Sequence, residues 1–413
     1  MSSHFDNRYL IVLSAFLIQV VMVGCMFAYG VFFKALEADL NWSRTTLSAT
    51  YSISFLVIGV LGILAGRFSD RFGPRWVLRI AGVLFGLGYA LMYFISSPWQ
   101  MYLFYGLLVG AGISAHDVVL LSTVARWFDK RRGIMTGIVK IGAACGQMTI
   151  PLLAVVLIDH FGWRAAFAIL GCSAVVLLLI GAQGMRRNPP AASDAKVETG
   201  LEPESGPSSA QGSKTAAETG LALSATFRTR QFWTLCAVQF AFVTSLVTVP
   251  VHIPAHGMDL GMTPTAAAGL LSIIGLCSVA GRALVGSGAD RIGGRRAIMI
   301  CLMILSSALL VLLFVETPSG LYLFAAIYGV SHGGLLTVVA PLIAEYFGTL
   351  VHGQIFGVVL FFGTLGGALG PLLAGIAFDH SGSYQAMFIA MTVLAGIGLV
   401  LATTLKPLGH SQI

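Results

Sequence analysis

Long apolar stretches, separated by short polar segments, run along almost the whole chain. Each stretch holds about twenty residues or more, the length that a helix needs to cross a hydrocarbon core of ~30 Å. The pattern predicts an all-α membrane protein with twelve transmembrane helices. We place them near residues 9–33, 45–66, 76–96, 99–125, 132–158, 163–184, 231–256, 264–288, 297–316, 319–345, 353–378 and 384–405.

One polar segment is much longer than the others. Residues 186–228 are rich in Pro, Gly, Ser, Ala and Glu and show no hydrophobic periodicity, which is typical of a flexible linker. This segment falls between the sixth and the seventh predicted helix. We therefore expect an N-terminal six-helix bundle over 1–185, a cytoplasmic flexible linker over 186–228 and a C-terminal six-helix bundle over 229–413.

The composition supports the membrane assignment and predicts an orientation. Of the 413 residues, 57% are apolar and 10% charged, and the mean hydropathy is +0.87, far from the balance of a soluble domain. The net charge of +7 does not indicate nucleic-acid binding, because the basic residues lie in short loops. Nineteen of the 24 Lys and Arg residues fall on one side of the predicted membrane and three on the other. By the positive-inside rule, both termini are predicted to be cytoplasmic, in a multi-pass protein of the inner (plasma) membrane.

The sequence repeats itself at an offset of 220 residues. The recurring residues are Gly66, Asp70, Arg71, Gly73 and Arg75 with Gly286, Asp290, Arg291, Gly293 and Arg295; Gly133 and Gly137 with Gly353 and Gly357; and Pro151, Asp159, His160 and Gly162 with Pro371, Asp379, His380 and Gly382. A match across the loops of both halves predicts two related six-helix bundles with a pseudo-two-fold axis along the membrane normal. One large class of secondary transporters is built in this way.

The first set of repeated residues forms a motif, G-x-x-x-D-R-x-G-x-R, which occurs once in each half. It resembles the loop motif of the major facilitator superfamily, and the resemblance covers the chain apart from the linker. The resemblance implies a twelve-helix transporter in which Asp70 and Asp290 lock the inner gate, by pairing with arginines and with a neighbouring helix N-terminus.

A narrower resemblance lies in residues 127–147. The matching residues are Trp127, Phe128, the basic run Lys130 to Arg132, and Gly137, Gly142 and Gly146. They are similar to the fifth-helix signature of the monocarboxylate transporter family and its bacterial oxalate:formate antiporter relatives. The segment Asn41 to Arg44 and the glycine before Arg282 agree with this assignment, whereas Ser278 stands where animal members carry a carboxylate. The resemblance implies transport of small carboxylates by alternating access.

Three strongly ionisable residues lie inside predicted membrane helices: Asp117, Lys140 and Arg282. Counted along their helices, all three lie roughly 9 to 12 Å from the cytoplasmic face, and charges at this depth are tolerated mainly in a bundle interior or a wet cavity. The planar fork of Arg282 matches a carboxylate with two parallel hydrogen bonds. If Asp117 neutralises Lys140, one positive charge is left for a monoanion. If Asp117 is protonated or turned away, the two cations suit a dicarboxylate.

Other polar residues are weaker candidates. His116 and His332 lie in membrane helices and are predicted to bind substrate or carry protons, with packing as the alternative. Tyr29 and Thr364 are predicted to line the path. His252 and His256 are interpreted as a pH-sensitive gate or as interfacial residues in preference to a metal pair, because Pro254 separates them. The six cysteines are scattered one per apolar stretch, so neither a metal site nor a cofactor is predicted.

The sequence therefore predicts a monomeric secondary transporter of a small organic anion, a lactate- or pyruvate-like monocarboxylate carried together with protons. The alternatives are an anion exchanger for oxalate-like dicarboxylates and a broader exporter of organic compounds. The chain has no Walker motif for ATP-driven transport. A membrane enzyme would need a nucleophile with its base or a metal cluster, and a sensor would need a sizeable soluble domain.

Overall fold

The computed structural model describes residues 2–128, 132–186, 223–348 and 352–405, and these residues are almost entirely helical. The helices are α1 (Ser2–Leu40), α2 (Arg44–Phe72), α3 (Pro74–Leu91), the short 3₁₀ helix η1 (Met92–Phe94), α4 (Pro98–Met101), the π-helix η2 (Tyr102–Val109), α5 (Gly110–Ile113), α6 (His116–Trp127), α7 (Arg132–Gly184), α9 (Leu223–Thr226), α10 (Arg230–Asp259), α11 (Pro264–Ile292), α12 (Gly294–Leu312), α13 (Pro318–Phe347), α14 (His352–Ser381) and α15 (Gln385–Thr404).

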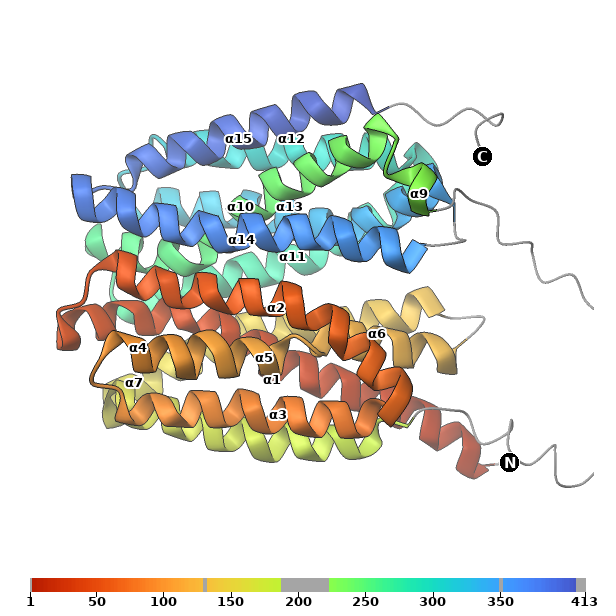
Figure 1. The fold of residues 1–413 in the computed structure, drawn as a ribbon. Helices are drawn as coiled ribbons and strands as arrows, with labels where there is room; N and C mark the ends of the chain where they lie inside the picture. The colour runs from red at the N-terminus through yellow and green to blue at the C-terminus, as the bar shows by residue number, and fades with distance from the viewer. Residues whose placement is uncertain (1, 129–131, 187–222, 349–351, 406–413) are drawn as a thin grey trace, which may run out of the picture.

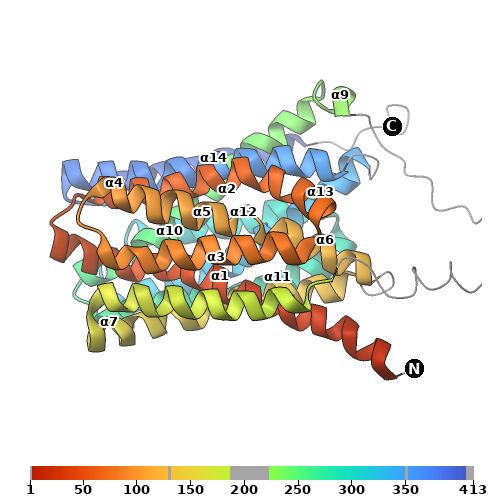
Figure 2. The same cartoon turned by 60° about the horizontal axis from the view of Figure 1, so that its bottom comes forward.

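The helices lie side by side in two groups, as Figure 1 shows. The first group comprises α1 to α7 and the second group α10 to α15, and each surrounds a core of buried apolar side chains. Helix α1 begins and α15 ends at the same end of the molecule, which we call the terminal end; the opposite end is the far end (Figure 1, and from another side Figure 2). Most of the predicted linker lies outside the described residues, so the division into two bundles and a linker stays a prediction.

Eleven helices in the described residues are long and apolar enough to cross a membrane. The prediction of an all-α membrane protein is confirmed, and the difference from twelve has a local cause. One of the eleven spans, Ile134–Gly184, has 51 residues and contains both the fifth and the sixth predicted helices. Its backbone is non-helical at Gly162, where φ is 76° and ψ is 161°. Only glycine adopts such a conformation readily, and the repeat partner Gly382 also has a positive φ, of 67°.

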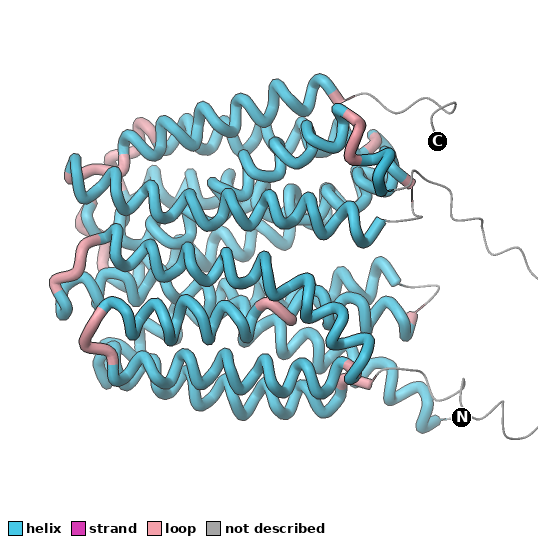
Figure 3. The backbone as a smooth tube through the Cα atoms, viewed as in Figure 1, coloured by secondary structure: helices cyan, strands magenta, loops and turns pink. Residues whose placement is uncertain are grey.

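The fourth predicted helix, over 99–125, is not continuous. A turn at Ser114 and Ala115 separates α5 from α6, and Figure 3 shows it as a loop in the middle of the first group. The preceding segment, Tyr102–Val109, is π-helical, a rare form that is frequent at functional sites. The equivalent helix of the second group, α13, runs unbroken over Pro318–Phe347. The break is therefore a feature of the first group alone, and the sequence prediction missed it.

Glycines repeat the same tight corner in both groups. Gly73 ends α2 with φ 87°, and Gly293 ends α11 with φ 83°. In each case the glycine N–H donates to the carbonyl four residues earlier, at 2.9 Å. Because a side chain is strained at positive φ, these motif glycines are explained by the turn that they make.

The two groups meet along two symmetric helix pairs, α2 with α14 and α7 with α11. At the first crossing a Cβ on Gly367 would lie 2.7 Å from the ring of Phe55, and at the second a Cβ on Gly275 would lie 3.5 Å from Cβ of Gln147. The offset of 220 relates Phe55 to Gly275 and Gln147 to Gly367. A large residue thus faces a glycine at both crossings, which brings the helices into close contact.

Close packing inside the first group yields a test of stability. A Cβ on Gly146 of α7 would overlap the carbonyl oxygen of Val20 on α1, whereas nothing lies within 4 Å of a Cβ on Gly137. We expect Gly146→Ala to destabilise the chain by about 1–3 kcal/mol, because overpacking forces the helices apart. Thermal unfolding of the purified protein measures the effect.

Gly137→Ala is the matched control, since it lies on the same helix. It is expected to leave the unfolding temperature unchanged or to raise it slightly, because alanine favours a helix over glycine. Equal unfolding temperatures for the two variants would contradict this account of the α1–α7 contact.

Candidate functional site

Four polar side chains of the first group form a cluster around Asp117. Its Oδ2 lies 2.7 Å from Nζ of Lys140, and its Oδ1 accepts a hydrogen bond of 2.7 Å from Nε2 of Gln19. Nε2 of His116 lies 3.5 Å from the same Oδ1. The side chains of Lys140 and Asp117 are 35% and 41% exposed, so other protein atoms do not enclose this ion pair completely, although it lies within the predicted membrane helices.

The helix break explains how Asp117 takes this position. Because the chain turns at 114–115, Asp117 stands in the first turn of α6. The partial positive charge of a helix N-terminus stabilises a carboxylate there. Gln19 was not among the predicted site residues, since a lone glutamine in an apolar helix carries little signal. Its repeat partner at the offset of 220 is Gln239, also buried, and this recurrence is the signal that marks it.

Arg282 reaches this cluster from the second group. Its Nη1 donates a hydrogen bond to the backbone carbonyl of Lys140, and it interacts electrostatically with Asp117. The three ionisable residues predicted to share one level therefore lie together, from α6, α7 and α11. Lys140 and Arg282 carry two positive charges and Asp117 one negative charge, which leaves a net charge of +1 when the histidines are neutral.

His332 lies on α13 and interacts electrostatically with Arg282. Its Nδ1 is 3.4 Å from Oγ of Ser278, which stands one turn before Arg282 on α11. The His332 ring meets the ring of Tyr328 and, across the two groups, the edge of Phe27, at centroid distances of 5.8 and 6.0 Å. The imidazole is 3% exposed.

Tyr29 and Thr364 do not join these residues. Tyr29 is fully buried in the first group, where its hydroxyl donates to the Leu47 carbonyl at 2.6 Å. Thr364 lies at the crossing of α2 and α14, with Oγ1 packed where a Cβ on Gly59 would stand. Tyr29 thus makes a hydrogen bond inside the first group and Thr364 a packing contact between the groups, and a role in lining the path stays a prediction.

The repeated motif lies at the terminal end. Arg75 donates from Nη2 to the carbonyl of Gln183 at 2.6 Å, and Arg295 donates in the same way to Thr403. Each arginine thus joins the loop to the last helix of its own group. The side chains of Asp70 and Asp290 lie outside the described part of the structure, so their role as gate locks stays a prediction. Glu345 accepts from the Gly294 amide, at the N-terminus of α12.

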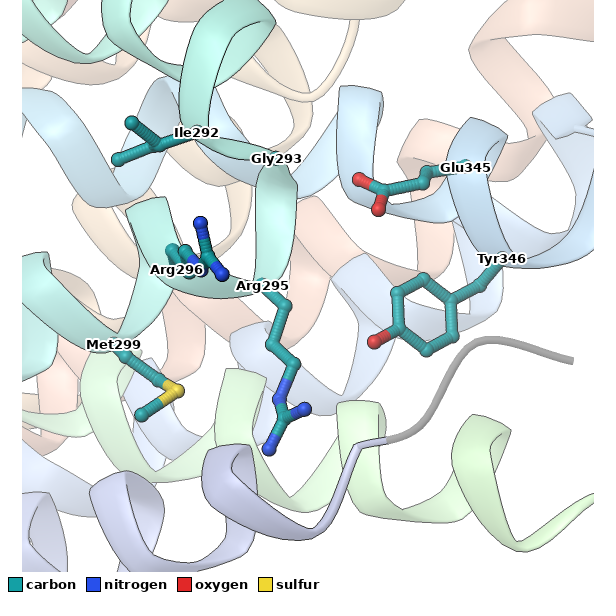
Figure 4. Close-up of a pocket in the computed structure, with 7 residues that line it drawn as sticks. All are labelled: Ile292, Gly293, Arg295, Arg296, Met299, Glu345 and Tyr346. Carbon is teal, nitrogen blue, oxygen red and sulfur yellow. The ribbon is translucent and has the colours of Figure 1, made fainter.

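A cavity of about 370 Å³ lies beside the second copy of this motif. Figure 4 shows the residues that line it, with Tyr346 and Arg295 alongside each other: Ile292, Gly293, Arg295, Arg296, Met299, Glu345 and Tyr346. None of the residues predicted to bind substrate is among them. We therefore assign this cavity to the motif loop and not to the cluster around Arg282.

A second charged cluster joins the two groups at the far end. Arg44 of α2 donates two hydrogen bonds to Asp259 of α10, from Nη1 to Oδ2 at 2.7 Å and from Nη2 to Oδ1 at 3.0 Å. Its Nε also donates to Glu37 at 2.8 Å, and Lys34 lies 2.7 Å from Asp259. The Arg44 side chain is 3% exposed. Because Asp259 belongs to the second group, this cluster holds the far end closed.

Backbone contacts strengthen this closure. Asp379 of α14 accepts hydrogen bonds from the amides of Arg44 and Thr45, at 3.0 and 2.8 Å, and so caps the N-terminus of α2. Asp379 was noted in the sequence as the repeat partner of Asp159. The sequence did not show that Asp379 contacts the other helix group, whereas Asp159 is exposed.

Tyr384 and His252 extend the same cluster. Arg44 Nη1 donates to the Tyr384 hydroxyl at 2.7 Å, and burial raises the pKa of Tyr384 above its ordinary value, so the phenol keeps its proton. That proton points to Nδ1 of His252, 3.1 Å away, while Nε2 of His252 donates to the Pro371 carbonyl at 3.1 Å. These partners assign a neutral imidazole with its proton on Nε2. His252 is thus part of the closure.

Two repeated helix groups with charged residues between them define a secondary transporter that spans the membrane several times. The chain belongs to the Major Facilitator Superfamily, whose sequence profile matches residues 15–294 and 259–412. It is therefore a transporter and not an enzyme.

Curated relatives place the chain as a distant homologue of monocarboxylate transporters. It is 28% identical to Monocarboxylate transporter 13 of Bos taurus over 400 residues, which cover 95% of this chain and 88% of that protein. It is 26% identical to Monocarboxylate transporter 4 of Gallus gallus, with 93% and 78% covered. The uncharacterized MFS-type transporter YhjX of Escherichia coli (strain K12) is 25% identical, with 87% and 85% covered.

Solved structures confirm the fold. A point mutant of the nucleoside transporter NupG superimposes with a TM-score of 0.74 at 13% identity, over 96% of this chain and 99% of that one. A bacterial homolog of the human lysosomal transporter Spinster, in an inward-facing and unoccupied conformation, gives a TM-score of 0.71 at 16% identity, over 96% of both chains.

Proposed function

We propose that this protein transports small monocarboxylates of the lactate and pyruvate kind, together with protons, by alternating access. The observation that carries the proposal is the charge balance at the centre. Asp117 neutralises Lys140 through a contact of 2.7 Å, which leaves the charge of Arg282 for a monoanion. A guanidinium offers a carboxylate two parallel hydrogen bonds, and the names of the relatives point to the same class of substrate.

The closed far end supports alternating access. Hydrogen bonds join the two helix groups at two levels. At the far end they involve Arg44 and Asp379, and nearer the terminal end Arg282 bonds to the Lys140 carbonyl. We infer that an anion reaches Arg282 from the terminal end in this conformation. The basic loops at that end favour a cytoplasmic location, with the protein in the inner (plasma) membrane and both termini in the cytoplasm. Rocking of the two groups would then expose the same site to the other side.

Uptake into proteoliposomes tests the proposal. Labelled lactate, pyruvate, oxalate and an aromatic acid are compared, with and without an inward proton gradient. We expect lactate or pyruvate to accumulate several-fold over protein-free vesicles only with the gradient, because entry of a proton with each monoanion makes the cycle electroneutral. Oxalate, with its second negative charge, is expected to be a poor substrate while Asp117 neutralises Lys140.

Two other results would replace this proposal. Uptake that does not depend on the proton gradient but requires an anion inside the vesicles would identify an exchanger. A preference for oxalate would show that Lys140 also binds substrate. Transport of the aromatic acid with no transport of small carboxylates would favour a broader exporter.

A further inference from the structure

His332 lies close enough to Arg282 for the charges of the two side chains to affect each other. Ser278 contacts the imidazole through a separation of 3.4 Å and stands four residues before Arg282, so the two residues lie on one face of α11. The positive charge of Arg282 acts on the His332 ring. Two rings also lie beside it, those of Tyr328 on the same helix and Phe27 on α1, and neither carries a charge.

This environment opposes a second positive charge when no anion is present. Burial disfavours the imidazolium, and so does the nearby guanidinium. A carboxylate bound to Arg282 would cancel that repulsion, because it brings one negative charge to the same face. By linkage, a proton on His332 would then strengthen binding of the carboxylate by the same factor.

We propose that His332 binds the transported proton and that its protonation and anion binding to Arg282 stabilise each other. The inference rests on the proposed carboxylate function. One proton adds to a ring nitrogen of the neutral imidazole, so the site loaded with a proton and a monoanion keeps the net charge of +1 that the empty site has. The Ser278 hydroxyl remains a partner in both states, since it donates to neutral Nδ1 and accepts from protonated Nδ1. Phe27 belongs to the other helix group, so rocking moves it off the imidazole and opens a route for the proton.

His116 provides the contrast. Its ring already faces the carboxylate of Asp117 at 3.5 Å, and Nδ1 bonds to the Ile113 carbonyl at 2.6 Å. A negative charge therefore accompanies His116 whether or not an anion is bound to Arg282. Because His116 belongs to the central cluster, the matched control is His160→Gln instead: His160 is exposed outside both charged clusters, and its Nδ1 bonds to the Val156 carbonyl at 2.9 Å.

Calorimetric titration of the full-length protein with pyruvate measures proton uptake directly. The titration is done at neutral pH in two buffers with different heats of ionisation. We expect the wild type and His160→Gln to take up about one proton per anion bound, as linkage requires. His332→Gln is expected to bind pyruvate with no proton uptake, and in proteoliposomes a proton gradient should no longer increase its uptake.

His332→Gln counts as folded if it still binds pyruvate and its unfolding temperature is unchanged. If it is not folded, His332→Asn replaces it in the experiment. Proton uptake that persists in the folded His332→Gln variant, or that is also lost in His160→Gln, would overturn the inference and leave carboxylate transport standing. A wild type that binds no small carboxylate would overturn the proposed function and the role of His332 together.

Discussion

Arg282→Lys is expected to lower monocarboxylate uptake by roughly 10- to 100-fold while the protein stays folded. Lysine keeps the positive charge but loses the planar fork that makes two parallel hydrogen bonds. Each charge-assisted bond contributes about 1.5–3 kcal/mol, and tenfold in affinity corresponds to about 1.4 kcal/mol. Initial rates of pyruvate uptake into proteoliposomes, over a range of concentrations, give the measurement. Arg282→Gln, which also loses the charge, is expected to be weaker still.

Arg228→Lys is the control for this substitution, because Arg228 is exposed and lies just before α10. It should transport like the wild type. If Arg282→Lys matched the wild type in both affinity and rate, the proposed bidentate hydrogen bonding of a carboxylate by Arg282 would be wrong. A single positive charge would then be sufficient for binding.

Arg44→Gln is expected to open the far end. Breaking a fully buried ion pair costs about 3–5 kcal/mol. Because the carboxylates of Glu37 and Asp259 are about a quarter exposed, we expect the substitution to destabilise the closed state relative to the open state by about 2–3 kcal/mol. That shifts the ratio of open to closed molecules by roughly 30- to 150-fold. Spin labels at Ser96 and Ser319, on exposed far-end positions of the two groups, report the change as a longer distance between them.

Arg164→Gln is the matched control for the far end. Arg164 forms a 2.7 Å ion pair with Asp39 inside the first group, with side chains 40% and 49% exposed. Exposed pairs contribute about 0–1 kcal/mol, so the label distances should not move. Unchanged distances in a folded Arg44→Gln protein would show that contacts other than this arginine keep the far end closed.

The fold was largely readable from the sequence because membrane spans and a duplicated motif leave strong one-dimensional signals. In lipid, a membrane-spanning helix satisfies its backbone polar groups with internal hydrogen bonds, so the length of an apolar stretch is enough to locate the helix in the sequence. The repeat was equally informative, and the paired corners at Gly73 and Gly293 follow it closely. The turn at 114–115 left no comparable mark, since its residues, Ser114 and Ala115, are ordinary in helices.

The central site was predicted in part for the same reason. A charge in an apolar stretch is conspicuous, and Asp117, Lys140 and Arg282 are found together. The far-end cluster was not predicted, because Arg44, Asp259 and Asp379 lie at helix ends where charges are ordinary. Only their pairing across the two helix groups gives them a common role, and such pairing is a property of tertiary structure.

The hydrogen bond from Arg282 to the Lys140 carbonyl has a consequence for the two faces of the membrane. An anion bound through that Nη1 hydrogen would first have to replace the carbonyl, at a cost of about 1.5–3 kcal/mol for a bond to a charged donor, whereas one bound through the other N–H donors of the guanidinium would not. In the proposed transport cycle, binding through Nη1 would give a higher half-saturating concentration on the terminal side than on the other side. The final gradient of a proton-coupled carrier would be unaffected, since the driving ion would set it, but release would outpace rebinding. Such a carrier would collect its solute from a dilute medium and resist reloading from a concentrated interior.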